Sequence, residues 1–123
     1  MDFGFSEEQT LLRETVRKLM DRHATPDTIR RLDREQAYPD ELYAAWVDAG
    51  LLRLPFPEEY GGLGGSVVDM VIVCEELSRR STDFSMSFGG SVFCGLNIVR
   101  KGSEAQKRYW LPKLLAGEIT QCL

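Results

Sequence analysis

The sequence is poor in the residues from which metal and nucleophilic sites are built. It has one histidine, His23, and three widely spaced cysteines, Cys74, Cys94 and Cys122, with no C-x-x-C pair. A single histidine disfavours a Ser-His-Asp or Cys-His catalytic arrangement and a zinc site, so we expect no metal. An odd number of cysteines without a pairing motif favours reduced, buried thiols and a cytoplasmic-type compartment.

Net positive charge, a long apolar run and a signal peptide are also lacking. Fifteen basic and nineteen acidic side chains give a net charge of -4, whereas a nucleic-acid binder carries a basic excess on one face. The longest near-apolar run, residues 67–74, is interrupted by Asp69 and is too short to span a bilayer. The first residues, MDFGFSEEQ, have neither the basic nor the apolar part of a signal. We therefore expect no nucleic-acid partner, no membrane span and a cytoplasmic location.

The remaining candidates for chemistry are weak. Adjacent carboxylates occur at residues 7–8, 58–59 and 75–76, but neighbours on a helix point about 100° apart, so we interpret them as cap charges and solvated edges. The stretch GGLGGS, residues 61–66, lacks the lysine of a phosphate-binding P-loop. We interpret it as a tight turn with several positive φ angles that leads into a helix capped by Ser66.

Capping residues and apolar spacing predict a single all-α domain over residues 1–123. Ser6 with Gln9 forms a capping box, Pro26 fits the first position of a helix, and Gly50 fits the position just after one. The result is an orthogonal bundle of about six helices. They are expected at residues 6–22, 26–36, 40–49, 67–78, 84–100 and 103–116.

Two of these segments have a competing strand interpretation. Residues 67–78 are apolar almost all round, which predicts a buried central helix, although valine and isoleucine also favour strands. In residues 81–102, alternation around Ser85–Phe88 favours a strand, and Gly89 and Gly90 would each cost a helix about 1 kcal/mol. A helix instead gathers Phe84, Phe88 and further apolar residues on one side. The last residues, GEITQCL, have the pattern of a strand beginning without a partner.

Three motifs together resemble the N-terminal helical domain of the acyl-CoA dehydrogenases, over essentially the whole chain. They are PEEYGGLGGS, EELSR and GSEAQKRYWLPKLLAGE. The resemblance implies a homo-oligomeric, FAD-dependent flavoenzyme that desaturates an acyl-CoA thioester. In that family a carboxylate removes the α-proton, and electrons pass to an electron-transfer flavoprotein. The family's T-E-P-x-A-G-S-D flavin motif would begin after Leu123. We therefore expect the middle β-domain, the C-terminal helices and the base to be absent, and this chain alone to be inactive and unable to hold FAD.

The resemblance also implies which residues meet the substrate. The family's helix corresponding to residues 84–100 lines the acyl cavity, which places Ser85, Phe88, Gly89 and Val92 against the acyl tail. Small residues there are also explained by a close helix–helix crossing. Leu123 falls where the family's chain first approaches the flavin. No residue of this chain is expected to be catalytic.

Two alternative functions remain open. A related flavoenzyme, such as an acyl-CoA oxidase or a flavin monooxygenase, shares the helical domain. A free-standing helical interaction module is the alternative from another class. In either case exposed apolar surface predicts self-association of the isolated chain.

Overall fold

The computed structural model describes residues 4–120, which form six helices and no strand. The prediction of an all-α domain is confirmed, and residues 81–102 adopt the helical alternative. Two short 3₁₀ turns, η1 (Leu51–Arg53) and η2 (Glu58–Tyr60), lie between the third and the fourth helix. Residues 119 and 120 are not in a strand, and Leu123 and Cys122 lie outside the described residues. The helices are α1 (Glu7–His23), α2 (Pro26–Glu35), α3 (Asp40–Asp48), α4 (Val67–Ser78), α5 (Thr82–Lys101) and α6 (Glu104–Leu115).

Each expected cap is present. Ser6 accepts a hydrogen bond from the Gln9 N–H at 3.1 Å, and Ser66 accepts one from Asp69 at 3.2 Å. These bonds satisfy backbone donors that a helix start leaves without a partner. Gly50 follows α3 with a φ of 75°. The helix boundaries therefore follow from local sequence.

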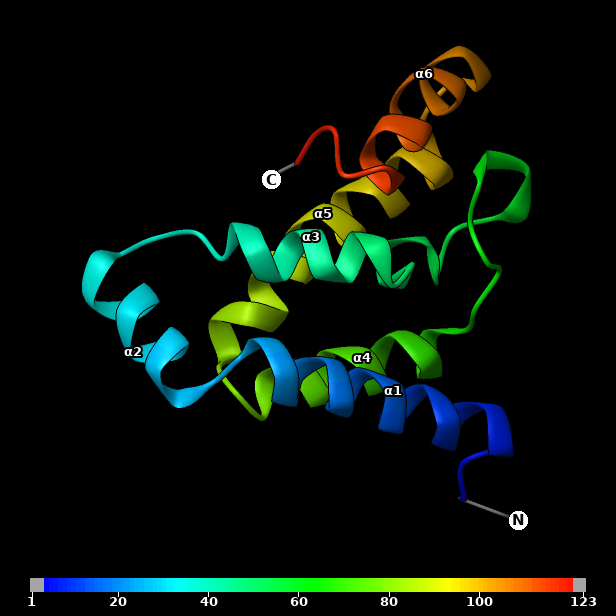
Figure 1. The fold of residues 1–123 in the computed structure, drawn as a ribbon. Helices are drawn as coiled ribbons and strands as arrows, with labels where there is room; N and C mark the ends of the chain where they lie inside the picture. The colour runs from blue at the N-terminus through cyan, green and yellow to red at the C-terminus, as the bar shows by residue number, and fades with distance from the viewer. Residues whose placement is uncertain (1–3, 121–123) are drawn as a thin grey trace.

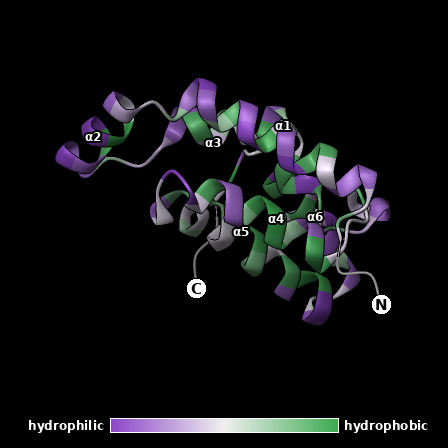
Figure 2. Ribbon diagram, turned by 90° about the horizontal axis from the view of Figure 1, so that it is seen from below, coloured by the Kyte–Doolittle hydropathy of each residue, from purple (hydrophilic) through white to green (hydrophobic). Residues whose placement is uncertain are grey.

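The helices are arranged around the long α5. α1 and α4 lie side by side, while α5 runs obliquely past α3 and meets α6 at its far end (Figure 1). α2 is mainly hydrophilic, has no buried residue and stands at the edge of the molecule (Figure 2). No helix among the described residues is long and apolar enough to cross a membrane.

Trp46 joins three helices in the core. Its side chain is fully buried, and its ring meets those of Phe84 and Phe88 edge-on, with centroids 6.3 Å apart in both pairs. The indole N–H donates to the Met20 Sδ at 3.4 Å. Edge-to-face aromatic pairs each add about 0.5–1.5 kcal/mol beyond the area that they bury. Trp46 of α3 therefore holds α5 on one side and α1 on the other.

The glycine-rich segment between η2 and α4 folds back on the residues before it. Gly64 has a φ of 65°, and its N–H donates to the Phe56 carbonyl at 2.9 Å. A Cβ on Gly62 would lie 1.9 Å from the same Phe56 oxygen, so no larger residue fits there. The prediction of a tight structural turn is confirmed.

α4 departs from the prediction of a helix buried all round. Val67, Val68 and Val71 are 67, 48 and 54% exposed, while Val73 and Leu77 are fully buried. The prediction is wrong because α4 packs mainly against α1 and α5, which leaves these three valines on its outer side.

Glu76 corrects a second expectation, since it is not a solvated edge charge. Its carboxylate is only 4% exposed and receives two hydrogen bonds from Arg17, at 2.7 and 3.1 Å. Arg79 lies 3.6 Å away. The bonds from Arg17 hold the pKa of the Glu76 carboxyl below its ordinary value, although burial alone would raise it. The pair links α1 to α4.

Replacing Glu76 with glutamine should remove most of this link and its pH dependence. At pH 7 we expect E76Q to lower the free energy of unfolding by about 1–2 kcal/mol, since the Arg17 side of the pair is open to solvent. The folded-state pKa is depressed, so the contribution is complete above the unfolded value of about 4.3 and disappears as pH falls through the folded value. Urea unfolding of both proteins from pH 7 down to about 3 should show the difference closing.

The matched control is Glu75→Gln, because Glu75 is the exposed neighbour on the same helix and makes no ion pair among the described residues. It should leave both stability and its pH dependence nearly unchanged. A difference between E76Q and the parent that is constant over this pH range would contradict the role given to the Glu76 charge.

Candidate functional site

α5 has one side in the core and one side open. Met86 is 68% exposed and Phe93 is 49% exposed, and Gly90 lies between them at half-burial. With the exposed Asn97, their spacings of four, three and four residues place them along one face of a helix. We call Met86, Gly90, Phe93 and Asn97 the open face of α5.

The four residues predicted to line an acyl cavity fall in two places. Phe88 and Val92 are fully buried in the core cluster, so neither offers surface to a ligand in this structure. Ser85 is half-buried, and its Oγ donates to the Thr82 carbonyl at 2.9 Å. Gly89 lies beneath Phe93, whose ring is 3.0 Å from where a Gly89 Cβ would be. Ser85 and Gly89 therefore border the open face, and contact of all four with an acyl chain stays a prediction.

Small residues of α5 also serve a close crossing, at a position that the sequence did not single out. A Cβ on Gly95 would lie 2.5 Å from the Leu114 Cδ2 and 2.6 Å from the Phe56 Cζ. These atoms belong to α6 and to the segment after η1. The crossing explanation thus holds at Gly95, while Gly89 meets only the accessible ring of Phe93.

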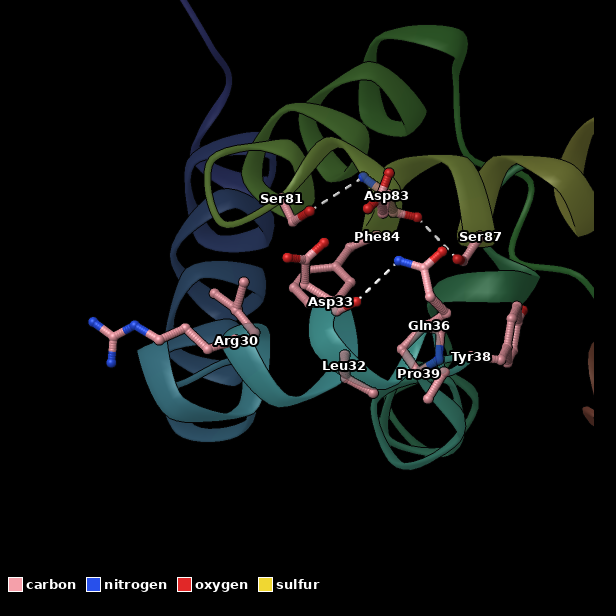
Figure 3. Close-up of a pocket in the computed structure, with 12 residues that line it drawn as sticks. Arg30, Leu32, Asp33, Gln36, Tyr38, Pro39, Ser81, Asp83, Phe84 and Ser87 are labelled. Atoms are coloured by element: carbon pink, nitrogen blue, oxygen red, sulfur yellow. Dashed lines mark hydrogen bonds between the residues drawn. The ribbon is translucent and has the colours of Figure 1, made fainter.

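A cavity of about 510 Å³ lies beside the start of α5, between that helix and α2 (Figure 3). The rings of Tyr38 and Phe84 and the side chain of Leu32 form its apolar part. Burial raises the pKa of the Tyr38 hydroxyl to about 12, and Tyr43 and Asp40 add to the shift. The lining residues are Ile29, Arg30, Leu32, Asp33, Gln36, Ala37, Tyr38, Pro39, Ser81, Asp83, Phe84 and Ser87.

Hydrogen bonds inside the chain occupy several polar groups of this cavity. The Gln36 side chain donates to the Asp33 carbonyl at 3.0 Å, and the Ser87 Oγ donates to the Asp83 carbonyl at 2.9 Å, as Figure 3 shows. The cavity contains no histidine or cysteine. It offers a hollow of suitable size for a small ligand.

Metal or thiol chemistry finds no support in the described part of the chain. No group of three or more His, Cys, Asp or Glu side chains there could hold a metal ion. Cys94 is buried, and burial raises the pKa of the half-buried Cys74 thiol. The features described above, the open face of α5 and the cavity between α5 and α2, are suited to binding a ligand.

Comparison with known proteins gives the chain its context. Residues 6–118 match the family model described as acyl-CoA dehydrogenase, N-terminal domain. The chain is similar to mitochondrial isovaleryl-CoA dehydrogenase from Pongo abelii, with 39% identity over 98% of this chain and 29% of that protein.

Two solved structures share the fold. Butyryl-CoA dehydrogenase from Megasphaera elsdenii has a TM-score of 0.87 and 27% identity, over 98% of this chain and 32% of that one. An acyl-CoA dehydrogenase from Bacillus anthracis complexed with FAD has a TM-score of 0.85 and 30% identity, over 95% and 20% of the two chains. The chain thus spans less than a third of the length of these proteins.

Replacing glycine with alanine is expected to have opposite effects on stability at Gly95 and at Gly89. Gly95→Ala should lower the free energy of unfolding by about 1–3 kcal/mol, because the new methyl group overlaps Leu114 and Phe56. Gly89→Ala should be neutral or stabilise by up to about 1 kcal/mol, because alanine favours a helix and the Phe93 ring can move outward. Thermal or urea unfolding of the two variants measures both. Equal destabilisation by the two changes would mean that the Gly89 side of α5 is packed as tightly as the Gly95 side.

Proposed function

The chain belongs to the acyl-CoA dehydrogenase family, and from that premise we propose that residues 1–123 form the N-terminal helical domain of an FAD-dependent enzyme that α,β-desaturates an acyl-CoA thioester. The observation that supports this most is the match of residues 6–118 to that domain. The relatives named above are dehydrogenases, which favours this function over an oxidase or a monooxygenase.

The part that we propose for this domain is one wall of the acyl site, formed by the open face of α5. Met86 and Phe93 supply exposed apolar surface, and the small Gly90 leaves room between them. Ser85 and Gly89 extend the wall along its border. Phe88 and Val92 lie behind it and set its position through the core. Apolar surface of this kind lowers the free energy of an acyl chain by about 25 cal/mol for each Å² removed from water.

FAD, when bound, supplies the hydride acceptor of such an enzyme, but the glycine-rich turn does not form a cradle for it. The backbone N–H groups of the glycine-rich turn donate to carbonyls of this chain: Gly62 to Pro57, Leu63 to Arg53 and Gly64 to Phe56. None of these is free for a phosphate. We therefore propose that FAD and the catalytic carboxylate are held by other parts of the enzyme. This chain's role is to bind the acyl tail and exclude water from it.

Three further properties belong to the same proposal. We propose a homo-oligomeric parent enzyme that passes electrons to an electron-transfer flavoprotein, as the family resemblance implies. We also propose a reducing, cytoplasmic-type compartment, because Cys74 and Cys94 are both free.

The activity test uses the full-length protein that carries this chain, loaded with FAD. It should reduce a ferricenium dye when isovaleryl-CoA or butyryl-CoA is added, while the 123-residue chain alone should stay colourless and inactive. A full-length protein that binds FAD but reacts with no acyl-CoA would contradict the proposed reaction. An isolated chain that is yellow and active would contradict the placement of FAD and the base.

The wall is tested by Phe93→Ala in the full-length enzyme. Removing the ring lengthens the space along α5, and each methylene buried in a pocket changes discrimination by about 1–3 kcal/mol. We expect the kcat/KM ratio of hexanoyl-CoA to isovaleryl-CoA to rise by about tenfold or more. The matched control, Leu11→Ala, removes an apolar side chain on α1 that is 65% exposed and should leave the ratio unchanged. If the kcat/KM ratio is the same in F93A and the parent enzyme, Phe93 is not part of the wall.

A further inference from the structure

A groove of about 400 Å³ lies at the elbow between α5 and α6, away from the Gly95 crossing. Trp110 lines it with 40% of its surface exposed, and Ile98 adds apolar surface from the other helix. An exposed tryptophan at the edge of a groove is typical of an interaction site, because Trp supplies much contact area at little cost in conformational entropy. The lining residues are Asn97, Ile98, Lys101, Gly102, Gln106 and Trp110.

The polar groups that line this groove are mainly hydrogen-bond donors. The Gln106 Oε1 already accepts from the Ser103 N–H at 2.8 Å, which leaves its NH₂ group. The Trp110 indole N–H and the Lys101 ammonium group make no hydrogen bond to any residue between 4 and 120. Asn97 adds a side-chain amide that can both donate and accept. With three donors beside this one amide, the lining fits a ligand that carries oxygen acceptors, above all a carboxylate.

Charge in the segment that forms the groove has the sign opposite to that of the whole chain. Residues 97–113 hold five basic side chains and one acidic one, in a chain whose net charge is -4. The acidic residue, Glu104, pairs with Arg108 at 2.9 Å and accepts a hydrogen bond from the Tyr60 hydroxyl. Four positive charges therefore remain without an ion pair within the described residues. They are those of Arg100, Lys101, Lys107 and Lys113.

A second aromatic ring packs beside that of Trp110. The Tyr109 ring meets it edge-on, with centroids 4.8 Å apart at 87°, and the Lys113 ammonium lies 3.7 Å from the Tyr109 centroid. The groove thus combines an exposed aromatic anchor, free donors and positive charge nearby.

We propose that the α5–α6 elbow is a docking site for an acidic segment of a partner protein, in which an apolar side chain packs on Trp110 and neighbouring carboxylates meet Lys101 and the basic side chains nearby. Charge complementarity carries this choice of partner. A nucleic acid fits less well, because only a few charges are uncancelled and the rest of the chain is acidic.

The probe is a blocked hexapeptide, Glu-Asp-Leu-Glu-Asp-Phe, titrated into the 123-residue chain. The chain has two tryptophans, and Trp46 is fully buried, so a ligand-dependent blue shift of tryptophan emission reports on Trp110. We expect the shift with this peptide and, for Lys101→Glu, binding weaker by about tenfold. Trp110→Ala should weaken binding of a dye-labelled peptide by about the same factor or more, measured by anisotropy.

Lys18→Glu is the matched control, since Lys18 is exposed on α1 and far in sequence from the groove. It makes the same change of charge and should leave the affinity unchanged. The proposal is overturned if the peptide does not bind, if its Gln/Asn analogue binds equally well, or if K18E weakens binding as much as K101E. It is also overturned if inorganic phosphate alone displaces the peptide at equal concentration, or if a thymidine oligonucleotide binds more tightly than the peptide does.

Discussion

The rotation of α5 about its own axis is the constraint on which the rest of the structure depends. Two contacts set it from the same side. Near its start, Phe84 and Phe88 pack edge-on against the buried Trp46, and near its end Gly95 lets Leu114 and Phe56 approach closer than any side chain would allow. Because a helix cannot turn without breaking both contacts, the side opposite them is left open. That side is the open face of α5.

Besides the α5–α6 elbow, apolar surface remains accessible in two further regions of the described residues. One is the open face of α5, and the other is the outer side of α4 with Val67, Val68 and Val71. Contiguous exposed apolar surface usually marks a place where a protein meets something else. α4 keeps this orientation because its opposite side is fixed to α1 by Leu77 in the core and by the Arg17–Glu76 pair. The described residues thus combine a packed core with accessible apolar surface on α4 and α5.

Local sequence signals were sufficient to predict where the helices lie in the chain, but not which side of each helix is buried. Capping at Ser6 and Ser66 predicted where helices begin, because the cap is formed within four residues. The phase of α5 was harder, since the same apolar stripe with Phe88 and Val92 was assigned both to the core and to the ligand. In the structure the stripe faces the core, where Phe84 and Phe88 pack against the buried Trp46. The accessible side of α5 is therefore the one with Met86 and Phe93. Likewise, nothing near Glu76 in the sequence indicates that Arg17, far along the chain, would bury it as an ion pair.

Methionine oxidation measures the central claim, that the open side of α5 faces the acyl chain. Met86 is 68% exposed, whereas Met20 and Met70 are buried and serve as internal references. In the 123-residue chain, peroxide should oxidise Met86 much faster than the other two. In the full-length enzyme, a bound acyl-CoA should slow the oxidation of Met86 while leaving the references unchanged. Oxidation of Met86 at the same rate with and without acyl-CoA would contradict the account.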